Sequence, residues 1–176
     1  MIRRPVASLA CGVLIAAALA GCSGSNLPAG LPGFYHDLAH EDAAVDAGAA
    51  QSMISGYRAN NGLGPVTIDP ELMKLATDQA RVMAARDKLE HDAGRPFQDR
   101  IRNSGFDASV AVENISAGYH TLAEAFSGWR DSPPHRANML NRGVTKMGIA
   151  AVYSPQSKYK VYWALILAAP DELHRG

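Results

Sequence analysis

The sequence predicts an α+β protein, a three-layer α-β-α sandwich around a small, mainly antiparallel central sheet. Three stretches support this class. Residues 159–168 are apolar on both faces, which is typical of a central strand covered by helices on both sides. Residues 147–153 precede them and predict the other arm of a hairpin. Residues 69–89 carry apolar side chains at helical spacing, so this helix has a face that must pack on a sheet or on another helix.

Two helices are expected in the first half of the domain. Residues 49–60 predict the first, which the glycine-rich stretch 60–64 ends. Asp69-Pro70-Glu71 predicts the start of the second, because Asp is a good N-cap, Pro fits the first helical position and an acid suits the first turn. This second helix is expected to run to about Leu89.

Helix and strand signals also alternate in the second half. A short helix is expected after Pro96, followed by a strand over residues 110–117. Thr121 and Glu124 have the spacing of a capping box and predict the start of another helix. Its apolar positions end at Trp129, which we expect in the core.

The residues after Trp129 predict that a helix restarts at Pro133. Ser132 is a good N-cap, because its hydroxyl can accept a hydrogen bond from a free amide, and Pro133 fits the first helical position. His135 then lies in the first turn, where the helix dipole disfavours an imidazolium. A neutral imidazole can ligate a metal or accept a proton.

Glu113 is a carboxylate within the apolar strand 110–117. If it is buried it needs partners, because an unpaired buried charge is very costly. Backbone amides or an arginine would satisfy it in a structural role.

The N-terminus is typical of a bacterial lipoprotein signal. Residues 1–21 combine Arg3 and Arg4 with a short apolar run, and Leu19-Ala20-Gly21-Cys22 resembles a lipobox in which Cys22 is lipidated and becomes the mature N-terminus. Residues 22–48 are expected to be a flexible tether, residues 49–169 the folded domain and residues 170–176 a polar tail. The protein would therefore be exported and lipid-anchored to the cell membrane or the outer membrane.

Charge and cysteine content limit which partners and which metal ligands the domain can use. Loss of residues 1–21 would leave 15 basic and 17 acidic side chains, which gives no electrostatic basis for binding nucleic acid. The two cysteines, Cys11 and Cys22, belong to the signal and the lipid site, so a metal site in the domain would use histidine and carboxylate. No coiled-coil pattern or exposed apolar stripe indicates a dimer, so we expect a monomer.

Four motifs follow one another along the chain. They are L-E-H at 89–91, E-N-I at 113–115, W-R-D-S-P-P-H-R-A-N-M-L at 129–140, and the late pair M-G-I-A and Y-W-A-L. Together they resemble the bacterial single-domain branch of the CAP superfamily, the cysteine-rich secretory, antigen 5 and pathogenesis-related proteins. The resemblance covers roughly residues 49–169 and implies the CAP (SCP-like) sandwich. Members often carry the arginine and asparagine that Arg58 and Asn60 match, and we expect both to be surface capping residues.

The resemblance implies a cleft formed by His91, Glu113 and His135, with Asn114 and Ser132 in support. Many eukaryotic members have two histidines and two glutamates there, the second glutamate three residues after the tryptophan. Ser132 holds that position in this chain, so three cavity residues are expected rather than four.

Three chemistries remain open for this cleft. Two imidazoles and a carboxylate are the ligand set of a zinc site with one open position. Alternatively, only the histidines bind the metal and Glu113 orients one of them. In a third arrangement the groups form a hydrogen-bond network without metal.

The expected function is a lipid-anchored cell-envelope module that binds a lipid or another envelope ligand and is not an enzyme. A metal-dependent hydrolase acting on an envelope peptide or ester is one alternative. A structural or interaction protein is another.

Overall fold

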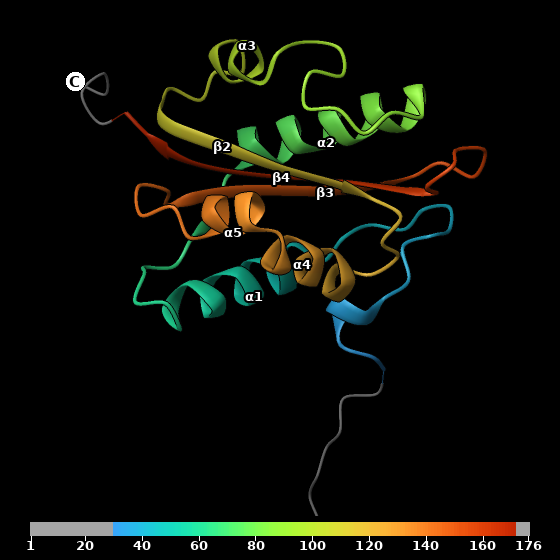
Figure 1. Cartoon of the computed structure of the whole chain (residues 1–176), viewed down its shortest axis with the longest axis horizontal. Coiled ribbons are helices and arrows are strands. Elements are labelled where there is room, and N and C mark those ends of the chain that lie inside the picture. The colour runs from blue at the N-terminus through green and yellow to red at the C-terminus, as the bar shows by residue number, and fades with distance from the viewer. Residues whose placement is uncertain (1–29, 172–176) are drawn as a thin grey trace, which may run out of the picture.

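The structure is a computed structural model and describes residues 30–171. The predicted signal peptide, Cys22 and residues 172–176 lie outside the described residues. Within residues 30–171 the chain forms five α-helices, one short 3-10 helix and four strands (Figure 1). In chain order they are η1 Gly33–Tyr35, α1 Ala47–Ala59, β1 Thr67–Ile68, α2 Pro70–Arg86, α3 Phe97–Arg102, β2 Ala108–Ala117, α4 Leu122–Asp131, α5 Pro133–Met139, β3 Lys146–Tyr153 and β4 Val161–Pro170.

The four strands form one mixed sheet in the order β1-β3-β4-β2. β4 pairs antiparallel with β2 and with β3, whereas the short β1 runs parallel to β3. All residues of β4 from Val161 to Ala168 are buried, as the apolar sequence predicted for a central strand. β2 forms one edge of this sheet, so its outer side does not pair with another strand of the sheet.

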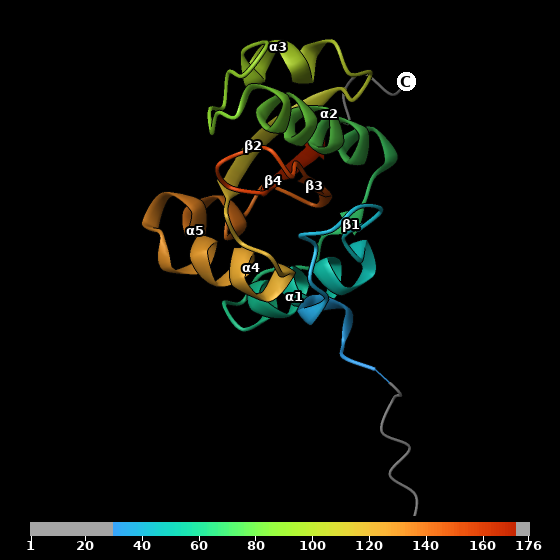
Figure 2. The ribbon, with the colours of Figure 1, turned by 90° about the vertical axis from the view of Figure 1, so that its right-hand side faces the viewer.

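Helices cover both faces of the sheet, which confirms the predicted α-β-α layers. α2 and α3 lie on one face, and α1, α4 and α5 lie on the other (Figure 2). Side chains of β4 alternate between two cores: Trp163 and Leu165 pack with α1 and α4, and Ala164 and Ile166 pack with α2. α2 approaches the sheet so closely that a Cβ at Gly148 would overlap the α2 backbone.

The predicted helix starts are present. The Asp69 carboxylate accepts hydrogen bonds from the first amides of α2, and Thr121 and Glu124 form a reciprocal capping box on α4. α2 ends at Arg86, three residues before the predicted end, because Asp87 turns into the left-handed region with φ 48°. None of the helices within residues 30–171 is long and apolar enough to cross a membrane.

The prediction of a flexible tether over residues 22–48 is wrong for the described part, residues 30–48. Leu38 is 5% exposed and joins the core beside α1 and α4. Its N–H donates to the carbonyl of His120 at 2.7 Å. Asp46 then caps α1 by accepting from the Ala49 amide. Leu38 and Val45 lie in a polar, glycine-containing segment without helical or strand periodicity, so the sequence pattern did not indicate that they pack on the domain.

The expectation that Arg58 is a surface capping residue is also wrong. Its side chain is 1% exposed, and its guanidinium donates to four backbone carbonyls. The acceptors are Gly64, Met139, Asn141 and Val144, at 2.8 to 3.1 Å. Arg58 therefore joins the end of α1 to the segment between α5 and β3.

Candidate functional site

The candidate site lies at the edge strand β2, where helices from both layers meet. Glu113 and Asn114 are successive residues of β2, so their side chains point to opposite faces of the sheet. Both are buried. Glu113 reaches His91 and Arg100, which belong to the α2–α3 side, and Asn114 reaches α5.

Glu113 is held by two neighbours. Its Oε1 accepts from Nδ1 of His91 at 2.9 Å and from Nη2 of Arg100 at 3.0 Å, and its Oε2 accepts from the same Arg100 nitrogen at 2.8 Å. The side chain of Glu113 is 1% exposed and that of Arg100 is 10% exposed. Arg100 is therefore the arginine that balances the buried carboxylate.

His91 follows α2 and keeps one ring nitrogen available. The hydrogen bond to Glu113 raises the pKa of His91 above the ordinary value, against the opposing effect of partial burial. Because the carboxylate accepts the Nδ1 proton, Nε2 carries the lone pair in the neutral ring. Half of the His91 side chain is exposed, so a ligand can reach it from solvent.

Two residues that sequence reasoning did not assign to the site fix the backbone of His91. Gln79 on α2 donates from Nε2 to the carbonyls of Glu90 at 2.8 Å and His91 at 3.1 Å. Arg100 also donates to the His91 carbonyl, at 2.9 Å. Gln79 lies on the buried face of α2, where a polar side chain needs partners. The apolar surroundings of Glu113 had predicted that a buried carboxylate needs partners, backbone amides or an arginine, without indicating which.

His135 lies on α5, on the other side of the β2 edge. Asn114 Nδ2 donates to its backbone carbonyl at 2.9 Å. Asn138 donates to Asn114 Oδ1 at 2.9 Å and to the Glu113 carbonyl at 3.1 Å, which joins α5 to the outer edge of β2. Burial lowers the pKa of His135, and the nearby charge of His91 lowers it further. His91 and His135 are 44 positions apart in the sequence, and the fold brings them close enough for the charge of His91 to affect the pKa of His135.

Ser132 occupies the junction between α4 and α5, where a helix restarts at Pro133 as predicted. Its hydroxyl makes no capping hydrogen bond to α5, so the prediction of a side-chain cap is wrong. Glu124 does not replace the second acid, because its carboxylate accepts from the amides of His120 and Thr121 at the start of α4. The structure thus connects His91, Glu113 and Asn114 to α5 and leaves Ser132 without a hydrogen bond to this group.

The residues fit a two-histidine metal site better than a three-ligand site. Within residues 30–171 no group of three or more His, Cys, Asp or Glu side chains is gathered so as to hold a metal ion. Both oxygens of Glu113 already accept hydrogen bonds, and the Arg100 cation lies beside them. His91 and His135 are the two residues that could hold a metal here, with Glu113 orienting the ring of His91.

Solved structures share this fold. The crystal structure of an extracellular protein containing an SCP domain from Bacillus anthracis str. Ames aligns with a TM-score of 0.60 at 21% identity and covers 68% of this chain and 38% of that one. An outer surface protein from Borrelia burgdorferi aligns with a TM-score of 0.65 at 20% identity and covers 72% of this chain and 93% of that one. The arrangement is therefore that of an SCP-type domain.

Residues 51–167 match the cysteine-rich secretory protein family (CAP), and the chain belongs to this family. The uncharacterized protein YkwD of Bacillus subtilis (strain 168) is 34% identical over 105 residues, which cover 58% of this chain. This chain spans 40% of the length of YkwD.

Proposed function

We propose that this protein is an exported CAP-domain protein of the cell envelope that binds a ligand at the β2 edge near His91 and His135, where the two imidazoles hold a divalent metal such as zinc. The observation that carries the proposal is the 2.9 Å hydrogen bond from His91 Nδ1 to Glu113. It fixes the ring and leaves Nε2 as a metal ligand, the usual role of a carboxylate behind a metal-bound histidine.

The contacts of Glu113 favour binding over hydrolysis. A metal-dependent hydrolase activates a bound water, which requires a base next to it. Glu113 is the carboxylate of this cleft, and both of its oxygens accept hydrogen bonds from Arg100. Glu113 is thus held by one Arg100 nitrogen and by His91, which supports a role in orienting His91 rather than as a base beside a bound water.

Calorimetric titration with zinc chloride tests the metal site on the purified protein. We expect one-to-one binding that is lost in both His91→Ala and His135→Ala and weakened about 10- to 100-fold in Glu113→Gln, since Glu113 acts through His91. His120→Ala, which removes a half-exposed histidine from another part of the surface, is the matched control and should bind as the wild type does. Equal affinity in all four variants would contradict the proposal.

Export and anchoring are proposed from the N-terminal sequence. The lipobox-like Leu19-Ala20-Gly21-Cys22 supports a lipid on Cys22, and two of the structural relatives are described as extracellular or outer-surface proteins. Expression in a bacterial host tests this: the wild type should fractionate with membranes and Cys22→Ser should not. Membrane fractionation of both would contradict a lipid anchor.

A further inference from the structure

Within residues 30–171, the outer edge of β3 has a neighbouring strand over only two of its residues. β1 pairs with β3 only at Lys146 and Met147. The Asp69 amide still donates to the Met147 carbonyl at 2.9 Å, and α2 then begins at Pro70, which takes the chain away from the edge. In the part of the chain that the structure describes, no strand pairs with the outer edge of β3 from Ile149 to Tyr153, whereas β4 pairs with its inner edge.

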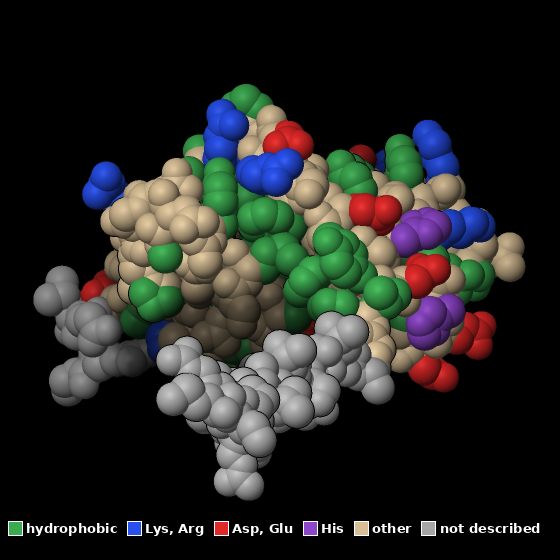
Figure 3. All heavy atoms as spheres, turned by 90° about the horizontal axis from the view of Figure 1, so that it is seen from below, with side chains coloured by type: hydrophobic (Ala, Val, Ile, Leu, Met, Phe, Trp, Pro, Cys, Tyr) green, Lys and Arg blue, Asp and Glu red, His purple; other side chains and the backbone are tan. Residues whose placement is uncertain are grey.

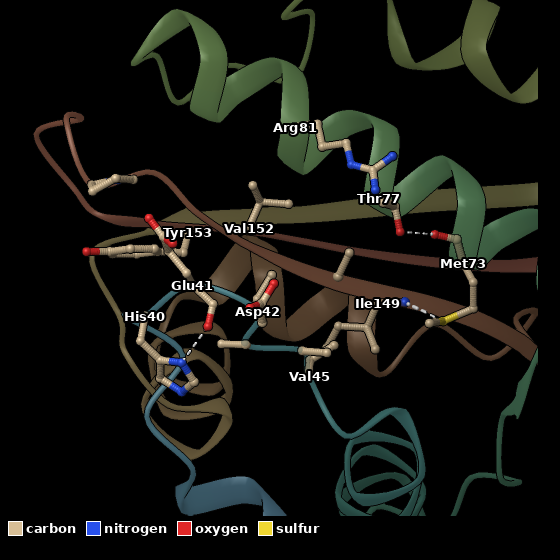
Figure 4. A pocket seen from close by; sticks show the side chains of 15 residues that line it. His40, Glu41, Asp42, Val45, Met73, Thr77, Arg81, Ile149, Val152 and Tyr153 are labelled. Carbon is tan, nitrogen blue, oxygen red and sulfur yellow. Dashed lines mark hydrogen bonds between the residues drawn. The ribbon is translucent and has the colours of Figure 1, made fainter.

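Alternate residues of β3 direct their backbone groups to this edge. The Ser154 amide donates to the Lys160 carbonyl, on the side of β4, so the two-residue alternation turns Ala151 and Tyr153 outward. Ile149 fits this pattern, because its N–H donates to the thioether sulfur of Met73 at 3.3 Å, a weak acceptor (Figure 4). Edge groups of this kind are a template for a further strand.

The edge lies at the bottom of a groove of about 650 Å³. α2 forms one wall with Met73, Thr77 and Arg81, and residues 40–45 form the other (Figure 4). A strand added here would direct alternate side chains toward α2 and toward residues 41–42. A second copy of this chain is a poor occupant, since its own edge lies equally deep and the walls would collide before the strands could pair.

Three charged side chains line the walls and take part in none of the ion pairs found within residues 30–171. Arg81 lies on the α2 wall, and Glu41 and Asp42 lie on the opposite wall. Asp42 sits at a turn with φ 63°, a conformation that Asp tolerates better than most residues. Seen from below, histidine and acidic side chains gather at one end of the molecule (Figure 3), and residues 36–42 contain two histidines and three acids.

We propose that the β3 edge from Ile149 to Tyr153 binds an extended peptide segment of a partner protein as an added strand. The segment carries an acidic side chain that faces Arg81. Basic side chains at the two adjacent positions face Glu41 and Asp42, because neighbouring residues of a strand point to opposite sides. The backbone hydrogen bonds supply affinity, and the two charged walls select the sequence.

The test is an amide NMR titration of the purified protein with the blocked peptide V-T-K-E-K-T-V. We expect shifts and slowed hydrogen exchange at the amides of Ala151 and Tyr153. The charge-exchanged peptide V-T-E-K-E-T-V should bind about tenfold more weakly, the sum of a few exposed ion pairs. Glu41→Gln/Asp42→Asn should reduce that difference to the part that Arg81 supplies, and Asn keeps the left-handed turn accessible.

A backbone variant tests strand addition separately from charge. Ala151→Pro removes an outward N–H at an edge position that tolerates proline, and it should abolish binding. If this variant fails to fold, the same peptide N-methylated at alternate residues is titrated instead. N-methylation removes the peptide's own N–H donors, so binding should again be abolished. Equal binding of both charge patterns would overturn the proposal, as would shifts confined to other elements. The proposal would also be overturned if, without peptide, the Ala151 amide exchanges slowly and the protein sediments as a dimer. That result would assign the β3 edge to a second copy of the chain.

Discussion

Glu113 carries a negative charge into a nearly fully buried position on β2, where His91 and Arg100 balance it. The sequence indicated that this carboxylate would need a partner. It did not indicate Arg100, because Arg95 and Arg102 lie in the same segment and only the fold determines which guanidinium reaches β2. The same limit applies to Gln79, whose role depends on where the loop after α2 returns.

Arg100→Gln should destabilise the protein by about 3–5 kcal/mol, because it leaves a buried carboxylate without its cation. Urea unfolding measures the change. Arg102→Gln is the matched control on the same helix, since that side chain is 69% exposed, and it should change stability by less than about 0.5 kcal/mol. Similar stabilities of the two variants would show that Arg100 does not pair with Glu113.

The two site histidines should titrate on opposite sides of the ordinary value of about 6.5. In protein stripped of metal with a chelator, the Glu113 hydrogen bond raises the pKa of His91, and burial with the His91 charge lowers that of His135. The stability that His91 contributes is present below its unfolded pKa and is lost as the pH rises through its folded pKa. The contribution of His135 is present above its unfolded pKa and is lost as the pH falls through its folded pKa. NMR titration of the ring signals measures the two pKa values. A lower pKa for His91 than for His135 would contradict the geometry.

At the scale of elements, the sequence predicted what local patterns determine. The capping residues at Asp69 and Thr121, the restart at Pro133 and the buried strand β4 follow from signals within a few residues of each other. β1 has only two residues, too short for a periodic signal, and its pairing with β3 depends on residues almost eighty positions away. The sequence did not indicate the buried role of Arg58, because three of its four acceptors lie more than eighty positions later in the chain.

Arg58→Met should destabilise the protein by at least about 3 kcal/mol, because four carbonyls lose their charged donor at once. Thermal or urea unfolding measures the loss. Arg86→Met is the matched control: it makes the same substitution at the exposed end of α2, where the side chain has no buried acceptors. It should change the free energy of unfolding little. A small effect of Arg58→Met would mean that these loops do not depend on the guanidinium.

At the scale of the whole molecule, the fold places two features on opposite edges of one sheet. The His91–Glu113 pair lies at the β2 edge, and the groove for which we propose a peptide lies at the β3 edge. Residues 30–46 complete the second feature and part of the core, so the folded unit begins before residue 49.

A fragment that starts at residue 49 should therefore be less stable than one that starts at residue 30. Leu38→Ala in the longer fragment isolates the main apolar contact and should cost about 2–5 kcal/mol. Denaturant midpoints of the three proteins provide the comparison. Equal midpoints for the two fragments would show that residues 30–46 rest on the domain without stabilising it.

The most direct test of the metal cleft is long-range ¹H–¹⁵N NMR of the histidine rings during zinc addition. We predict that His91 is protonated at Nδ1 in the neutral form, and that zinc shifts Nε2 of His91 together with one ring nitrogen of His135 at one equivalent. Zinc bound through Nδ1 of His91, or through His36 and His40 with the cleft unchanged, would contradict the role assigned to Glu113 and to the facing histidines.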